Sequence, residues 1–110
     1  MKRKEKNMET VRILLCCGAG MSSGFLASNT RKVAKKKKLN VTVEARSISE
    51  VGEYLDKIDV LLLGPHYASE LDQYKTVTAK YDVKVAAIPQ DIYATLDGAR
   101  LLDLAFSLLK

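Results

Sequence analysis

The sequence predicts an α/β fold: a single three-layer domain in which a four-stranded parallel sheet, in the order 2-1-3-4, carries helices on both faces. Three observations support this prediction. Short apolar runs alternate four times with stretches of helical periodicity. The connections between them are short, which favours parallel strands joined by right-handed crossovers. The chain of 110 residues is long enough for one core and too short for two.

Four segments have the composition of strands. The second alternates apolar and polar residues, which is typical of an edge strand with one exposed face. The first and third are almost uninterrupted apolar runs, as expected of central strands covered on both faces. Placing these two in the centre gives the order 2-1-3-4. The expected strands are, in chain order, Val11–Cys16, Val41–Arg46, Asp59–Leu63 and Val83–Ile88.

A helical segment follows each strand. The first begins at Ser22 or Ser23 and ends in a run of lysines, which would complement the dipole at the end of a helix. The second is short, with Ser49 as its N-cap. Gly64-Pro65 ends the third strand before the next helix begins. The expected helices are Ser22–Lys38, Ser49–Lys57, Tyr67–Lys80 and Asp91–Leu109.

Apolar residues spaced three and four apart indicate which helix faces are buried. For the first helix the expected core contacts are Phe25, Leu26, Val33 and Ala34. For the last helix they are Ile92, Leu96, Ala99, Leu102, Phe106 and Leu109. This second series runs the length of the segment and therefore predicts one continuous helix.

Charge and cysteine content narrow the class of protein. The net charge is +5, but the excess is concentrated in residues 1–10, predicted to be a disordered basic tail, and in residues 31–38. The aromatic residues, two Phe and five Tyr, do not interleave with these basic runs, so no nucleic acid partner is expected. The two adjacent cysteines provide no disulfide framework. Free thiols favour a reducing compartment, so we expect a cytoplasmic protein. No signal peptide or membrane-length apolar run is visible.

Cys17 follows the first strand at the beginning of a glycine-rich turn that leads into the first helix. Backbone N–H groups in such a turn, together with the positive end of the helix, form an anion site. The same field would lower the pKa of a thiol placed there. In a 2-1-3-4 sheet, ligands bind beside the carboxyl end of the first strand. Cys17 is therefore the candidate catalytic nucleophile. The candidate phosphate-binding loop comprises Gly18, Ala19, Gly20, Met21, Ser22 and Ser23.

Other interpretations of the two cysteines and the loop lead to different classes of protein. Cys16, on the opposite strand face, is predicted to be a small buried residue. Nucleotide binding is disfavoured because the chain has no Gly-Lys-Ser/Thr motif and its glycines do not have dinucleotide spacing. A low-molecular-weight cysteine phosphatase needs an arginine six residues after the nucleophile, but Ser23 stands there and Arg31 is two turns further on. Such a hydrolase, or a flavodoxin-like binding module, remains the alternative to a phosphoryl carrier.

The segment from Cys17 to Gly24, Cys-Gly-Ala-Gly-Met-Ser-Ser-Gly, resembles the phosphorylation loop of the IIB component of the bacterial phosphoenolpyruvate:sugar phosphotransferase system, lactose/cellobiose family. Residues 61–65 and the element Tyr93…Asp97-Gly98 match as well, and the resemblance covers about residues 11–110. It implies a phosphocysteine at Cys17, a IIA phosphohistidine donor, and a membrane IIC permease that presents a β-linked disaccharide-type sugar.

His66 is the only histidine in the sequence and follows the third strand, at the same sheet edge as Cys17. It could contact the phosphate or a partner, although a partly exposed loop residue is the simpler interpretation. No metal and no cofactor are expected, because loop amides and a helix N-terminus can stabilise phosphoryl transfer without a metal.

Overall fold

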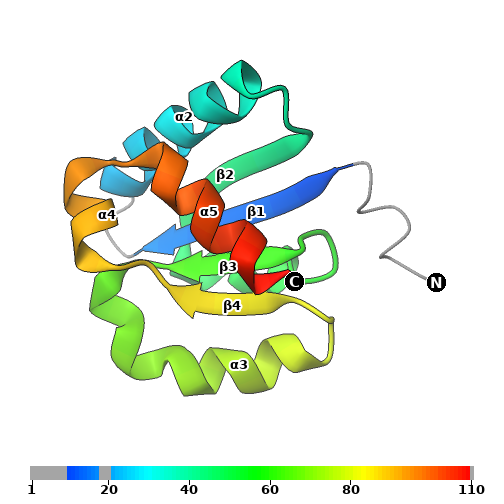
Figure 1. Cartoon of the computed structure of the whole chain (residues 1–110). Helices are drawn as coiled ribbons and strands as arrows, with labels where there is room; N and C mark the ends of the chain where they lie inside the picture. Colours follow the sequence, from blue (N-terminus) through cyan, green and yellow to red (C-terminus); the bar gives the residue numbers. More distant parts are fainter. Residues whose placement is uncertain (1–9, 18–20, 110) are drawn as a thin grey trace.

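The computed structural model describes residues 10–17 and 21–109, and for Cys17 and residues 21–23 it describes the backbone only. Residues 1–9 of the predicted tail (residues 1–10), together with Gly18, Ala19 and Gly20, lie outside the described residues. Four parallel strands form one sheet in the order β2-β1-β3-β4, which confirms the predicted topology (Figure 1). The strands are β1 (Val11–Cys17), β2 (Val41–Ser47), β3 (Val60–Leu63) and β4 (Lys84–Ala87).

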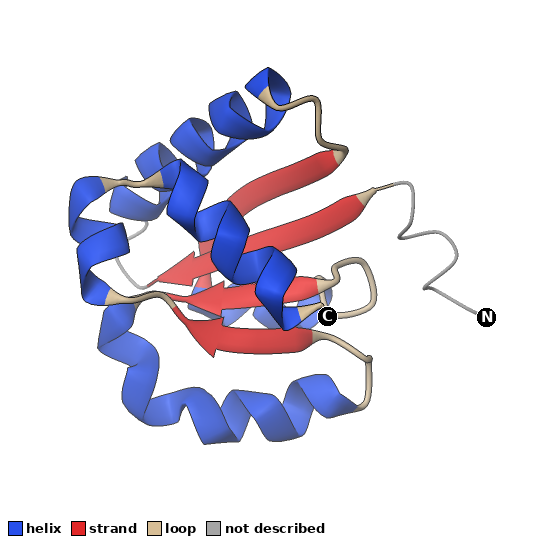
Figure 2. Cartoon of the chain, in the orientation of Figure 1, coloured by secondary structure: helices blue, strands red, loops and turns tan. Residues whose placement is uncertain are grey.

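Helices cover both faces of the sheet (Figure 2). The α-helices α2 (Met21–Lys36) and α5 (Gly98–Leu108) pack on one face. The 3₁₀-helix η1 (Ile48–Glu53) and the α-helix α3 (Leu71–Ala79) pack on the other. The core is divided in the same way, because side chains alternate along each strand. In β1, Ile13 and Leu15 face α2 and α5, whereas Leu14 and Cys16 face η1 and α3.

The central and edge strands also have the burial expected of them. All residues of β3 are buried, whereas β2, at the edge of the sheet, alternates between exposed positions and positions that are partly or fully buried. The strand β1 is one residue longer than predicted, because β2 continues to Ser47 and pairs it with Cys17. Cys17 is thus the last strand residue rather than the first loop residue.

The prediction that Phe25 packs in the core is wrong. Its side chain is 63% exposed, whereas the next residue, Leu26, is fully buried. The residues of α2 that face the sheet are Leu26, Ala27, Thr30 and Ala34. These positions share one helix face by 3.6-residue periodicity, and Phe25 falls on the opposite face.

The prediction of one continuous helix over 91–109 is also wrong. The helix is interrupted at Leu96, between α4 (Gln90–Thr95) and α5. Leu96 is left-handed, with φ of 54°, and the Asn29 side-chain amide donates to its carbonyl at 3.0 Å. Asp97 then caps α5 by accepting a hydrogen bond from the Arg100 N–H at 3.1 Å. Gly98 brings α5 against α2 so closely that a Cβ would lie 2.7 Å from the Thr30 backbone.

Two shorter helices also differ from the prediction. The segment expected as Ser49–Lys57 is the 3₁₀-helix η1, and its N-cap is Ser47 rather than Ser49. The segment expected as Tyr67–Lys80 is divided into a 3₁₀-helix, η2 (Pro65–Glu70), and α3. Pro65 at the first position allows the tight turn to begin directly after β3. Within the described part of the chain, no helix is long and apolar enough to cross a bilayer.

Candidate functional site

The carboxyl ends of β1, β3 and β4 lie side by side at one edge of the sheet, on the left in Figure 1. Two backbone hydrogen bonds join them just beyond the strands. The Gly64 N–H donates to the Cys16 carbonyl at 2.9 Å, and the Ile88 N–H donates to the Leu63 carbonyl at 2.7 Å. The elements α2, η2 and α4 all begin at this edge, so the residues at their first turns surround the end of β1.

Cys17 ends β1, and α2 begins four residues later at Met21. Of the candidate phosphate-binding loop, Gly18, Ala19 and Gly20 fall outside the described residues, and Met21, Ser22 and Ser23 form the first turn of α2. This 16-residue helix has no acidic residue in its first turn. Its positive end is therefore not compensated by a carboxylate of that turn and can act on an anion beside it.

Cys16 has the role expected of it. The residue is fully buried and its thiol is not in a disulfide. It packs in the cluster that η1 and α3 cover, close to Tyr74. Burial raises the pKa of Tyr74, and Glu70, Tyr67 and Cys16 contribute further in the same direction. Cys16 is thus part of the core, which leaves Cys17 as the candidate nucleophile.

His66 lies in η2 and is exposed. Its ring centroid is 4.7 Å from that of Tyr67 and 6.2 Å from that of Tyr93, the second contact being edge-to-face. Tyr93 comes from α4, so the structure brings together two elements that begin beside β3 and β4. This aromatic contact was not predicted. The sequence places each residue soon after a strand, since His66 directly follows Pro65 and Tyr93 comes four residues after Pro89, but it does not show that the two rings meet.

Among the described residues, the arginine side chains form hydrogen bonds or ion pairs that lie away from this edge or at its border. Arg31 Nη1 donates to the Val43 carbonyl at 2.5 Å, on the β2 backbone. Arg12 pairs with the buried Asp59 at 3.6 Å, and Arg46 pairs with Glu44 at 3.2 Å. Arg31 is the first arginine after the loop and thus the nearest in sequence to the position of a phosphatase guanidinium. That side chain is instead used to hold α2 to the edge strand.

An ion pair at the border of the site ties α4 to α5. Asp91 Oδ2 lies 2.7 Å from Arg100 Nη1, and Asp91 Oδ1 accepts from the Ile92 N–H at 3.0 Å. The hydrogen bond from Arg100 lowers the pKa of Asp91. Because Asp97 caps the N-terminus of α5 three residues before Arg100, both carboxylates help to fix the junction between α5 and α4, the helix that carries Tyr93.

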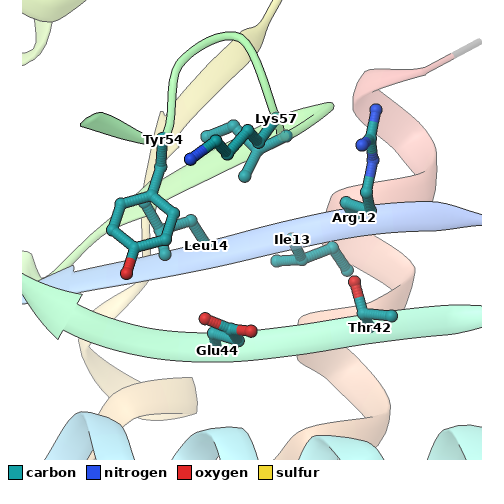
Figure 3. A pocket seen from close by; sticks show the side chains of 8 residues that line it. Arg12, Ile13, Leu14, Thr42, Glu44, Tyr54 and Lys57 are labelled. Atoms are coloured by element: carbon teal, nitrogen blue, oxygen red, sulfur yellow. The ribbon is translucent and has the colours of Figure 1, made fainter. Parts of the chain in front are cut away.

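A separate hollow of about 300 Å³ lies over the middle of β1 and β2 (Figure 3). Glu44 and Thr42 of β2 lie on one side of it, and Tyr54 and Lys57 lie across β1. Tyr54 also accepts a hydrogen bond from Arg46 Nε at 2.7 Å, which raises the pKa of Arg46. The hollow is lined from β1 by residues 12–14, well before Cys17, so it is not part of the candidate site. No group of three metal-binding side chains occurs among the described residues.

Comparison with solved structures defines the class of protein. The chain is similar to the cellobiose-specific phosphotransferase IIB component of Borrelia burgdorferi, at 33% identity and a TM-score of 0.74, over 90% of this chain and 91% of that one. It also shares its fold with the lactose-specific IIB domain of the Streptococcus pneumoniae phosphotransferase system (PTS), at 16% identity and a TM-score of 0.83, over 92% and 99% of the two chains. The fold is that of a IIB component.

The family model "PTS system, Lactose/Cellobiose specific IIB subunit" matches residues 12–104, and the chain belongs to this family. It is 26% identical to the oligo-beta-mannoside-specific EIIB component of Bacillus subtilis, over 89% of this chain and 95% of that protein. It is 30% identical to the lactose-specific EIICB component of Lacticaseibacillus casei, over 84% of this chain but only 16% of that longer protein. The resemblance seen in the sequence is thus confirmed, and the chain is a component of a sugar-transporting phosphotransferase system.

Proposed function

We propose that this chain is a phosphoryl carrier in which Cys17 accepts a phosphoryl group from a IIA phosphohistidine and passes it to a sugar held by a IIC permease. One observation carries the proposal: Cys17 ends β1 at the position where the strand order reverses, immediately before the N-terminus of α2. In open α/β sheets this crevice is where ligands bind.

The chemistry requires one nucleophile and a set of hydrogen-bond donors. The Cys17 thiolate attacks phosphorus, the S–P bond forms as the P–N bond breaks, and the imidazole of the donor leaves and takes up a proton. In the second step a sugar hydroxyl oxygen attacks phosphorus, its proton passes to a base on the permease, and the thiolate is released. The transition state is loose and its charge lies on the phosphoryl oxygens. The N–H groups of residues 18–23 would stabilise that charge.

Transfer rather than hydrolysis is favoured by the arrangement of the arginines. Ser23 stands where a low-molecular-weight phosphatase would place its arginine, and Arg31 is bound to the Val43 carbonyl. Without a guanidinium at the phosphate, the phosphocysteine is neither trapped nor readily hydrolysed. The relatives are named for lactose, cellobiose and oligo-beta-mannosides, which supports a β-linked disaccharide or oligosaccharide as the transported sugar. The proposed place of action is the cytoplasmic side of the membrane.

The proposal is tested by incubating the chain with phosphoenolpyruvate, the general phosphotransferase proteins and a IIA protein, and measuring its intact mass. We expect one phosphoryl group per chain, located on the peptide that contains Cys17, and its loss when membranes with IIC and the sugar are added. Hydrolysis of an aryl phosphate should be negligible. Rapid aryl phosphate turnover would instead identify a phosphatase. An unreactive Cys17 would indicate a binding module without phosphoryl transfer.

A further inference from the structure

We propose that the outer face of α2 binds the surface of an anionic lipid bilayer. We define this outer face as the exposed surface of α2 and of the turn that follows it, in which an apolar residue stands at each end of five lysines: Phe25, Lys32, Lys35, Lys36, Lys37, Lys38 and Leu39. The inference goes beyond the proposed phosphoryl transfer and does not depend on the chemistry of Cys17.

The first observation is an uneven distribution of charge. Residues 10–43 contain seven lysines and arginines and no aspartate or glutamate. Two of the seven are engaged elsewhere, Arg12 with Asp59 and Arg31 with the Val43 carbonyl. The five lysines are exposed, and none of the ion pairs found in the described part of the chain involves them. They form a concentrated positive surface that would attract an anionic one.

The second observation is the position of Phe25. At 63% exposure it is the most exposed large apolar side chain of the described residues. Positions 25, 32 and 36 fall within about 40° of one another around the helix axis. Phe25 therefore points away from the sheet on the same side as Lys32 and Lys36. An exposed aromatic side chain beside lysines can enter the headgroup region of a membrane while the lysines stay at its surface.

Leu39, after the last lysine, is 38% exposed and places a second apolar side chain at the other end of the outer face. An aliphatic side chain cannot stack on a nucleic acid base, whereas both Phe25 and Leu39 can enter the boundary between headgroups and acyl chains. The lysines can extend their charged ends toward lipid phosphates from the same surface. These features favour a bilayer over a nucleic acid as the occupant.

The placement of α2 makes such binding compatible with the transfer site. The helix has 16 residues, a length of about 24 Å, and runs from the edge that holds Cys17 to the opposite edge of the sheet (Figure 1). If α2 lies flat on a membrane, the edge of the sheet that holds Cys17 is not covered by the bilayer. Other proteins can then contact that edge. A carrier that must deliver a phosphoryl group to a permease would thereby stay close to it.

The experiment is cosedimentation with vesicles of phosphatidylcholine alone or mixed with phosphatidylglycerol, at two salt concentrations. We expect binding to the anionic vesicles only, weakened by salt. The variant Lys35→Gln/Lys36→Gln/Lys37→Gln/Lys38→Gln should bind at least about tenfold more weakly. The control Lys57→Gln/Lys75→Gln/Lys80→Gln/Lys84→Gln loses the same charge from exposed lysines off the outer face and should bind as the unchanged chain does. Equal loss in both variants, or no preference for anionic vesicles, would overturn the proposal.

Insertion of Phe25 can be followed separately, because the chain contains no tryptophan. The fluorescence of Phe25→Trp should shift to the blue with anionic vesicles, while Val77→Trp, at a 40% exposed position on α3, should not change. An unchanged Phe25→Trp spectrum would contradict the inference, as would tighter binding to a nucleic acid than to vesicles at the same salt. Cys17→Ser should bind vesicles as the unchanged chain does, so this result is independent of phosphoryl transfer.

Discussion

Two kinds of connection leave the carboxyl edge of the sheet. The connections after β3 and β4 reach their helices through proline, with Pro65 at the first position of η2 and Pro89 as the N-cap of α4. Neither helix has a side-chain cap, and each has only six residues. The connection after β1 contains no proline between Cys17 and Met21, and it leads into the 16-residue helix α2.

This difference decides where an anion can bind. Proline has no backbone N–H, and a short helix contributes little dipole, so the connections after β3 and β4 offer few donors at their first turns. They instead hold aromatic rings, those of His66 and Tyr93, against each other. The connection after β1 retains an N–H on every residue in front of a long helix. The connections after β3 and β4 thus flank the site, and the connection after β1 is the candidate for binding the phosphoryl group.

The largest effect is expected from Cys17→Ser, which should abolish phosphoryl acceptance because a serine hydroxyl lacks thiolate character at neutral pH. Folding should be retained. The matched variant is Cys16→Ala, whose side chain is fully buried. It should lower the free energy of unfolding by about 1 kcal/mol and still accept the phosphoryl group. Both are followed by intact mass and urea unfolding. Phosphorylation of the Cys17→Ser protein would show that another residue accepts the phosphoryl group, and His66 would be tested first.

A proline in the first turn of α2, directly after the connection from β1, tests whether the N–H groups there are what distinguish this connection from the other two. Ser22→Pro lies in the first turn of α2, where proline is tolerated, and it removes one N–H donor. We expect phosphorylation to slow by about 10²-fold, as for loss of one donor from an oxyanion site. The control Pro65→Ala adds a donor to the other kind of connection and should change the rate by less than a few-fold. A Ser22→Pro protein phosphorylated at the normal rate would show that this turn does not hold the phosphate.

Gly98→Ala tests how α5 is anchored to α2. The added Cβ would lie 2.7 Å from the backbone of Asn29 and Thr30, which cannot move as a side chain can. We expect a loss of about 1–3 kcal/mol in the free energy of unfolding, measured in urea. Gly24→Ala, a helical position with nothing within 4 Å of the new Cβ, should be neutral or stabilising. Equal stability of the two variants would mean that the helices do not approach this closely.

The smallest effect is expected at the ion pair between α4 and α5. The hydrogen bond from Arg100 lowers the pKa of Asp91 in the folded protein. The stabilisation is therefore present above the ordinary pKa of a free aspartate and disappears as the pH falls through the lowered value. Asp91→Asn should reduce the melting temperature slightly at pH 7 and not at all in strong acid. A difference that persists unchanged in acid would exclude the ion pair as its cause.

The sheet could be predicted because its signals are local. Apolar runs in β1 and β3, alternation in β2, and the position of Cys16 on the core face of β1 can each be read from a few neighbouring residues. The break at Leu96 could not be predicted in this way. Its carbonyl accepts from Asn29 and the following Gly98 packs on Thr30, so its cause lies in a helix far away in the sequence.

Phe25 shows a second limit of sequence patterns. Phe25 and Leu26 are adjacent and apolar, and only packing against the sheet decides which one is buried. The contact between His66 and Tyr93 likewise depends on two elements that meet only in the folded chain. For the candidate site, the structure places Cys17 at the end of β1 and the first turn of α2 near it, while the roles of Cys17 and residues 18–23 remain predictions.

Selective alkylation tests most directly whether the connection after β1 carries the reactive thiol. The folded protein is treated with a thiol reagent near neutral pH, with and without inorganic phosphate, and the labelled peptides are mapped. We expect rapid labelling of Cys17, protection of Cys17 as phosphate is added, and labelling of the fully buried Cys16 only after unfolding. Preferential labelling of Cys16 in the folded protein, or labelling of Cys17 that phosphate does not slow, would contradict the assignment.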